Sequence, residues 1–125
     1  MKIVEIITPR LIEGPLIDGR IVPRLPDGSP PKILYRVMSR AEYQAGAKVG
    51  HFTPRERTHA SATPLFQFAE PGDQNVVVAI DYDDRDGWQA KWMSDEVVAV
   101  THESIPMAKV HLVAQGTRRD LEAHI

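Results

Sequence analysis

Residues 75–82, NVVVAIDY, are the stretch of the chain that decides the fold. The continuous run of Val, Ala and Ile is typical of a strand buried on both faces, because a strand with one solvated face alternates apolar and polar residues. We therefore expect a central strand over 75–82, with other elements packed against both of its sides.

Four other short stretches predict further strands, because they are rich in β-branched or aromatic residues and are bounded by turn residues. They are Ile33–Met38 (ILYRVM), Thr58–Ser61 (THAS), Glu96–His102 (EVVAVTH) and Ala108–Val113 (AKVHLV).

Helix signals separate these strands. Residues 39–42 (SRAE) have the form of a capping box, which predicts a short helix that begins after Ser39, and Gly50 suits its end. Pro64 can begin a helical turn through residue 69, and Thr117 can cap a terminal helix. Strands and short helices in this order predict an α+β fold built on a small split β-sheet.

The first 31 residues differ from the rest because they hold six of the ten prolines. Ile3–Ile7 reads as a strand, and Asp18-Gly19 between apolar runs predicts a two-residue β-hairpin turn. A proline-rich linker follows from residue 23 to 31. We expect residues 1–31 to form an N-terminal arm that docks on a protein partner, on a second copy or on its own domain, and residues 32–125 to form that domain.

Composition narrows the possible functions. A chain of 125 residues with 42% hydrophobic residues has room for one core. The net charge of −2 gives no overall positive charge that would attract nucleic acid, so we expect no extensive nucleic-acid contact. No apolar run is long enough to span a membrane, so we expect a cytoplasmic protein. Cysteine is absent and the histidines lack the spacing of a helical zinc site, so we expect no metal.

Three segments carry an arginine, a serine and a glutamate in that chain order: LYRVM at 34–38, HASAT at 59–63 and SDEVV at 94–98. Together they resemble the three motifs of compact ADP-ribosyltransferase-like domains of the arginine-serine-glutamate class. In that class a Glu or Gln stands two residues before the catalytic glutamate, where this chain has Ser94.

The same region also resembles a small bacterial family known as domain of unknown function 952. The features of that family are a tyrosine in the first strand, a helix that ends before a Gly-aromatic pair, an Ile-His-x-Ser segment, an apolar strand that ends in an acidic residue, a tryptophan, and a Pro-His-x-Tyr segment before the last strand. The corresponding residues of this chain are Tyr35, Gly50 and Phe52, His59 to Ser61, Val76 to Asp81, Trp92, and Thr101-His102 ahead of Ile105-Pro106.

The resemblance implies NAD as the ligand, and transfer of ADP-ribose or hydrolysis of NAD as the activity. Arg36 would bind phosphate, Ser61 would order the site, and Glu96 would stabilise the ribosyl cation. His59 would take part in catalysis. The remaining nucleotide contacts would come from Tyr35, Thr63, Trp92 and His102. Convergence of the motifs predicts that Arg36, Ser61 and Glu96 line one concavity, with His59 or His102 at its wall.

Each of these residues also has a purely structural interpretation. Arg36 can pair with a structural carboxylate, Ser61 can satisfy local backbone, and Glu96 can be a solvated charge at a strand start. The chain is then a non-catalytic binding or structural protein, an alternative that Ser94 favours. A third alternative is phosphotransfer or nucleotide binding through His59 and Arg36. The aspartates at 81, 83, 84 and 86 read as a solvated acidic turn.

Overall fold

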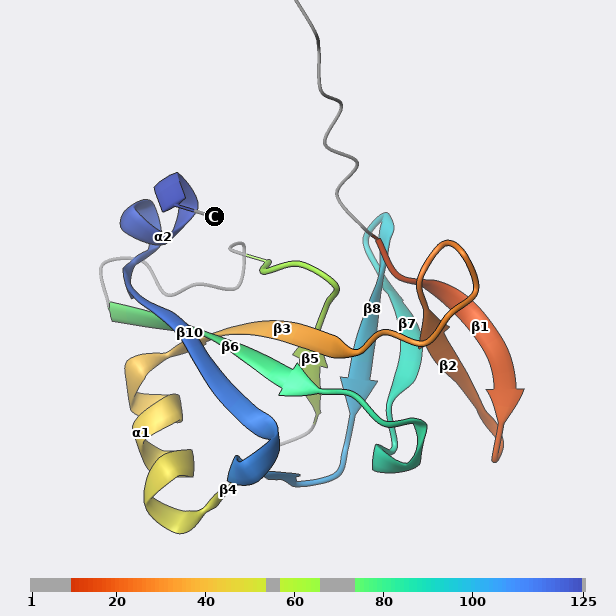
Figure 1. Cartoon of the computed structure of the whole chain (residues 1–125), viewed down its shortest axis with the longest axis horizontal. Coiled ribbons are helices and arrows are strands. Elements are labelled where there is room, and N and C mark those ends of the chain that lie inside the picture. Colours follow the sequence, from red (N-terminus) through yellow and green to blue (C-terminus); the bar gives the residue numbers. More distant parts are fainter. Residues whose placement is uncertain (1–9, 54–56, 66–73, 125) are drawn as a thin grey trace, which may run out of the picture.

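The chain folds around two three-stranded antiparallel sheets (Figure 1). The computed structural model describes residues 10–53, 57–65 and 74–124. The first sheet has the order β10-β6-β3, formed by β3 (Ile33–Ser39), β6 (Gln74–Asp81) and β10 (Val110–Thr117). The second has the order β5-β8-β7, formed by β5 (Thr58–Ala60), β7 (Gln89–Met93) and β8 (Glu96–Thr101). The predicted α+β class is confirmed.

Strand β6 is the centre of the first sheet, as its sequence predicts. All its residues from 75 to 80 are buried. Val76 and Val78 pack into a core cluster with residues of the second sheet, whereas Val77 packs on the opposite face in a separate cluster with Val37 and Leu121. Because successive side chains of a strand point to opposite faces, β6 is stable only with apolar layers on both sides.

Helix α1 (Arg40–Val49) begins and ends where the sequence predicts. The Glu42 amide donates to Ser39 Oγ at 3.1 Å, and Gly50 takes the left-handed conformation with φ of 85°. A Cβ atom at Gly46 would lie 2.2 Å from the ring of Phe52, so only glycine allows the helix to pack this closely on the core.

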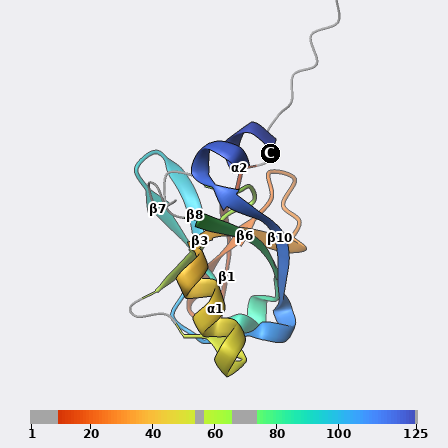
Figure 2. The same ribbon diagram turned by 90° about the vertical axis from the view of Figure 1, so that its left-hand side faces the viewer.

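Helix α2 (Arg118–His124) covers the other face of the first sheet. Leu121 is buried against Val37 and Val77, and Thr117 Oγ1 accepts a hydrogen bond from the Asp120 amide, as expected for a capped helix. In Figures 1 and 2, α2 lies above this sheet and α1 below it, so the two helices are on opposite sides of the sheet.

Several short elements complete the fold. Strand β4 (His51–Phe52) pairs with β9 (Ile105–Pro106), and 3-10 turns form at η2 (Asp84–Asp86) and η3 (Met107–Lys109). The strand predicted at 108–113 begins only at Val110, because η3 takes its first residues. Strand β7 was not predicted, since its polar and half-exposed residues lack a strong apolar pattern.

Two predicted elements fall on residues that the structure does not describe. The strand predicted at 3–7 lies wholly outside the described residues. The helical turn predicted from Pro64 lies mostly outside them, and Pro64 and Leu65 themselves are not helical.

Strands β1 (Ile12–Ile17) and β2 (Arg20–Arg24) form the predicted hairpin. Asp18 and Gly19 at its turn have φ of 49° and 77°, the positive values that a two-residue hairpin turn requires.

The hairpin packs on its own domain (Figure 1). Strand β2 contacts β7 and β8, Val22 is fully buried, and Leu11 pairs with Val97 and belongs to the main core cluster. Arg24 Nη1 and Nη2 donate to the two carboxylate oxygens of Asp84 at 2.9 and 2.8 Å. A boundary between an arm at 1–31 and a domain at 32–125 stays a prediction, but the shared core favours one cooperative unit.

Replacing Arg24 with Ala tests whether the hairpin is an integral part of the fold. Removing one partner of a buried ion pair costs about 3–5 kcal/mol. We expect a loss of about 2 kcal/mol in the free energy of unfolding, because the Asp84 side chain is 28% exposed and partly solvated. Urea unfolding measures this loss.

Arg85→Ala is the matched control, since the Arg85 side chain is 88% exposed and pairs with Asp83 at the surface. It should leave the unfolding midpoint unchanged. If Arg24→Ala unfolds at the same urea concentration as this control, the hairpin is a separable arm.

Candidate functional site

Arg36 occupies an unusual position in the first sheet. It lies on the same face of β3 as Leu34 and Met38, which are 0% and 4% exposed, and it pairs in register with the fully buried Val78. A guanidinium therefore stands in a row of side chains that otherwise forms the core. A charge in such a place must be compensated by hydrogen bonds, because its removal from water is costly.

Two partners compensate Arg36. Its Nε and Nη2 donate to the two carboxylate oxygens of Glu42 at 3.0 and 3.1 Å, and its Nη1 donates to the carbonyl oxygen of His59 at 3.0 Å. Only 19% of the Arg36 side chain is exposed, against 43% of the Glu42 side chain.

The role of Glu42 differs in part from the prediction. Its amide donates to Ser39 Oγ, which is half of the expected capping box. Its carboxylate, however, contacts Arg36. The sequence marks Glu42 only as a helix-capping residue, because no local pattern reveals a partner on the neighbouring strand.

Arg36 and Glu42 line a groove of about 800 Å³ beside helix α1. Among the described residues, His51 and Arg57 are its other ionisable lining residues, and Thr53 and Thr58 add hydroxyl groups. Its apolar lining includes Met38, Phe52, Ile80, Ile105 and Val110. In the part of the chain that the structure describes, the groove thus combines an apolar wall with two arginines and one acidic side chain.

The pKa of His59 reports the electrostatic character of this region. Burial lowers this pKa below its usual value of 6.5, and the positive charges of Arg57 and Arg36 lower it further. The imidazole is therefore neutral at pH 7. The half-buried His59 thus lies near two arginine side chains.

Ser61 and Tyr35, both predicted site residues, are joined by their backbones. The Tyr35 amide donates to the Ser61 carbonyl at 2.6 Å and the Ser61 amide donates to the Tyr35 carbonyl at 2.9 Å. The Tyr35 side chain packs on the opposite face of the sheet from Arg36. Ser61 is buried, Thr63 is half-buried in the bend that follows, and neither lines the groove.

Glu96 lies farther along β8. Its register partner is Met93 at the β7–β8 turn, whereas His59 pairs with Val100, four residues away. Four residues of strand span about 13 Å. Glu96 does not line the groove that Arg36 lines, so that groove does not bring together the predicted trio of Arg36, Ser61 and Glu96.

Trp92 and His102 also lie away from the groove lining. The Trp92 ring is 62% exposed on β7, and its Nε1 donates to the Glu13 carboxylate of the hairpin. His102 is exposed just after β8. Trp88, by contrast, is 1% exposed and belongs to the main core cluster.

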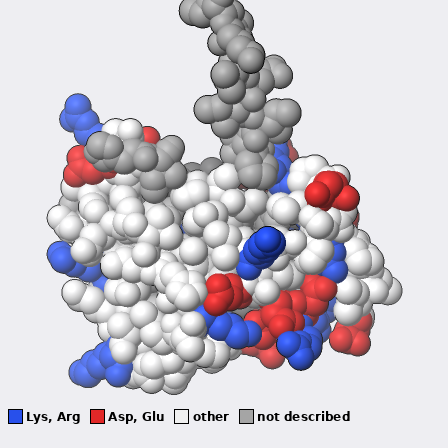
Figure 3. Space-filling model, viewed as in Figure 1, with Lys and Arg blue, Asp and Glu red and all other residues white. Residues whose placement is uncertain are grey.

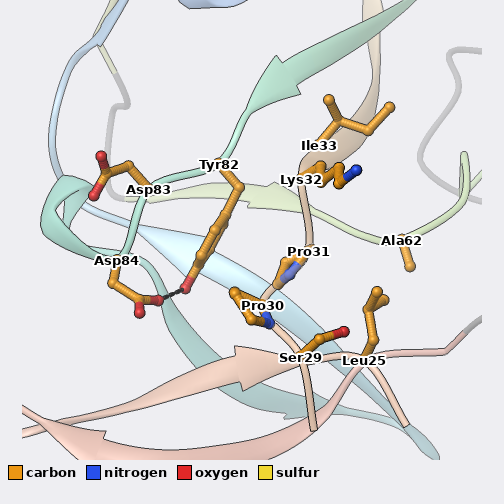
Figure 4. Close-up of a pocket in the computed structure, with 10 residues that line it drawn as sticks. All are labelled: Leu25, Ser29, Pro30, Pro31, Lys32, Ile33, Ala62, Tyr82, Asp83 and Asp84. Carbon is orange, nitrogen blue, oxygen red and sulfur yellow. Dashed lines mark hydrogen bonds between the residues drawn. The ribbon is translucent and has the colours of Figure 1, made fainter. Parts of the chain in front are cut away.

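A second concavity, of about 880 Å³, lies beneath the proline-rich segment (Figure 4). Figure 4 shows the Tyr82 side chain reaching Asp84, while the Asp83 carboxylate points away from Pro30 and Pro31. Tyr82 Oη donates to Asp84 Oδ1, and Asp84 is already held by Arg24. Burial and the hydrogen bond to Asp84 raise the pKa of Tyr82, so its hydroxyl stays protonated at neutral pH.

The acidic turn is more structured than predicted. Within the described residues Asp86 pairs with Lys109, Asp83 with Arg85 and Asp81 with His111, in addition to the Arg24–Asp84 pair. In Figure 3 acidic and basic side chains lie next to one another at the lower right of the face shown. No group of three or more potential metal ligands occurs in the described part of the chain.

Comparisons with protein-family models, curated proteins and solved structures found no match to this chain. Among the helices of residues 10–53, 57–65 and 74–124, none is long and apolar enough to cross a membrane.

The pH dependence of stability tests the Asp84 network. The hydrogen bond from Arg24 lowers the pKa of Asp84 below its usual value of 3.8. A lowered carboxyl pKa stabilises the folded state above the unfolded pKa, and this contribution is lost as the pH falls from 3.8 through the folded pKa.

Asp84→Asn should therefore lower the free energy of unfolding at pH 7 and make it fall less steeply between pH 5 and about pH 2. Denaturant unfolding at a series of pH values measures both effects. Parallel pH profiles for the variant and the wild type would contradict a native-state ion pair at Asp84.

Proposed function

We propose that this protein binds a small, phosphate-bearing ligand of the nucleotide type in the groove beside α1, with the phosphate at Arg36. The observation that carries this proposal is the guanidinium of Arg36 in an otherwise apolar row of β3, at the wall of the groove. Its planar fork matches two phosphate oxygens, and the strand holds it in place.

The rest of the groove suits the same ligand. A volume of about 800 Å³ falls within the range of small-molecule sites. Its apolar side chains can contact a flat ring, while Arg57 adds a second positive charge to the lining. Among the described lining residues, the arginines at 36 and 57 outnumber Glu42, which favours an anionic ligand.

A purely structural ion pair between Arg36 and Glu42 is the competing explanation. Ion pairs with a partner as exposed as Glu42 contribute little to stability. The neighbouring Leu34 and Met38 show that this row accepts apolar side chains. An arginine here is therefore better explained by a ligand than by packing.

The resemblance to ADP-ribosyltransferase-like domains makes NAD the first ligand to test. Cleavage of its glycosidic bond needs a carboxylate near the ribose, and Glu96 is outside the lining of this groove. Ser94 also stands where the related class has Glu or Gln. We therefore propose binding of the nucleotide in preference to ADP-ribosyl transfer or NAD hydrolysis.

Arg36→Met should weaken binding while preserving the fold. Methionine fills the apolar row, and the 43% exposed Glu42 side chain stays solvated when its partner is removed. We expect NAD and ADP to bind the wild type and to bind Arg36→Met at least tenfold more weakly, since hydrogen bonds to charged groups contribute about 1.5–3 kcal/mol. Calorimetric titration measures the affinities, and thermal unfolding checks the fold.

Adenosine, which lacks phosphate, is the matched ligand control and should bind both proteins equally weakly. Equal affinity of the wild type and Arg36→Met for ADP would contradict the proposal. Nicotinamide released from NAD by the wild type, and lost in Glu96→Gln, would instead restore the catalytic interpretation.

A further inference from the structure

The two charged groups at the centre of the groove are held very differently. Arg36 extends from a strand that pairs along its whole length with β6, and its guanidinium is also anchored on the His59 carbonyl. Glu42 extends from the first turn of α1, and both described hydrogen bonds of its carboxylate are to Arg36. Rotation of the Glu42 side chain into solvent would therefore break only this one pair.

We propose that Glu42 is a built-in competitor for the anion site of the groove. Its carboxylate occupies the fork of the Arg36 guanidinium and is displaced when a phosphate-bearing ligand binds. This inference rests on the proposed function, because it concerns how the same site is regulated. In the free protein, the Glu42 carboxylate thus blocks the anion site at Arg36.

The geometry supports displacement because the carboxylate uses the two nitrogens, Nε and Nη2, that would bind two phosphate oxygens. The third donor, Nη1, remains on His59 in either state and keeps the guanidinium oriented. The released Glu42 returns to water at the exposed side of the helix, so opening leaves no buried charge behind.

Displacement makes a quantitative prediction that simple repulsion does not make. We call the protein closed when Glu42 is paired with Arg36 and open when Glu42 is in solvent. If only the open state binds, the closed state weakens the apparent affinity of every ligand of this site by the same factor. That factor is one plus the ratio of closed to open protein. If Glu42 acted only by repelling anions, its removal would help ligands more as their charge increases. Pyrophosphate and the less highly charged malonate separate these two cases.

Calorimetric titrations of the full chain with pyrophosphate and with malonate provide the test. The variants are Glu42→Gln and Glu42→Ala, the second because glutamine can still accept a hydrogen bond from Arg36. Glu122→Gln is the matched control: it makes the same change in charge, in an exposed pair with Arg118 on α2. Circular dichroism confirms that each variant is folded.

We expect both Glu42 variants to bind pyrophosphate and malonate about three- to tenfold more tightly than the wild type, by the same factor for the two ligands. Glu122→Gln should bind both as the wild type does. In addition, the Arg36 Nε–H resonance of the wild type should shift on addition of pyrophosphate toward the position that it has in ligand-bound Glu42→Gln.

The remaining outcomes overturn different statements. If the wild type binds the ligands and neither Glu42 variant binds them more tightly, Glu42 is not a competitor, and the proposed function still stands. An improvement that increases with ligand charge overturns displacement in favour of repulsion. No binding of pyrophosphate to any variant, together with no binding of ADP to the wild type, overturns the proposed function and the competitor with it.

Discussion

Burial of β6 on both faces is the constraint on which the rest of the fold depends. A valine or isoleucine stabilises a protein by about 1.5–3 kcal/mol when it leaves water, and β6 presents such side chains to two sides at once. One face needs the second sheet and α1, and the other needs α2. The two core clusters are thus consequences of one uninterrupted apolar strand.

The candidate site arises where this apolar arrangement is interrupted. Arg36 belongs to the row of β3 side chains that lies beside the inward-facing side chains of β6, but its guanidinium lines the groove beside α1. The fold supplies it with a backbone acceptor at His59 and a carboxylate at Glu42. The same side chain is therefore a cost to the core and the group at which we propose that an anion binds.

The two concavities differ in what their polar groups already do. In the one under the proline-rich segment, Tyr82 and Asp84 are engaged with Arg24, an interaction that joins the hairpin to the domain. In the groove beside α1, the charged pair includes the Glu42 carboxylate, which is 43% exposed on the first turn of the helix. This greater exposure of the polar groups, together with the position of Arg36 in an apolar row, is why we propose ligand binding at the groove.

Local patterns in the sequence determined much of the secondary structure. The apolar run at 75–82, the serine and glycine that bound α1, and the Asp18-Gly19 turn act through neighbouring backbone, so residues close in sequence suffice to predict them. The choice of Arg36 as a candidate residue depended on the match of its segment to the first ADP-ribosyltransferase-like motif, because its place in an apolar strand alone favours a structural ion pair.

Only the tertiary structure decided what these elements contact. Glu42 turns to Arg36 instead of completing the capping box, the hairpin packs on β7 and β8, and the register of β8 places Glu96 about 13 Å from the residue paired with His59. Each of these outcomes depends on strand register and on side chains distant in sequence. Side chains alternate between the two faces of a strand, so the sequence determines which face Arg36 occupies. The partner that compensates the charge of Arg36 is determined by the packing of the whole chain.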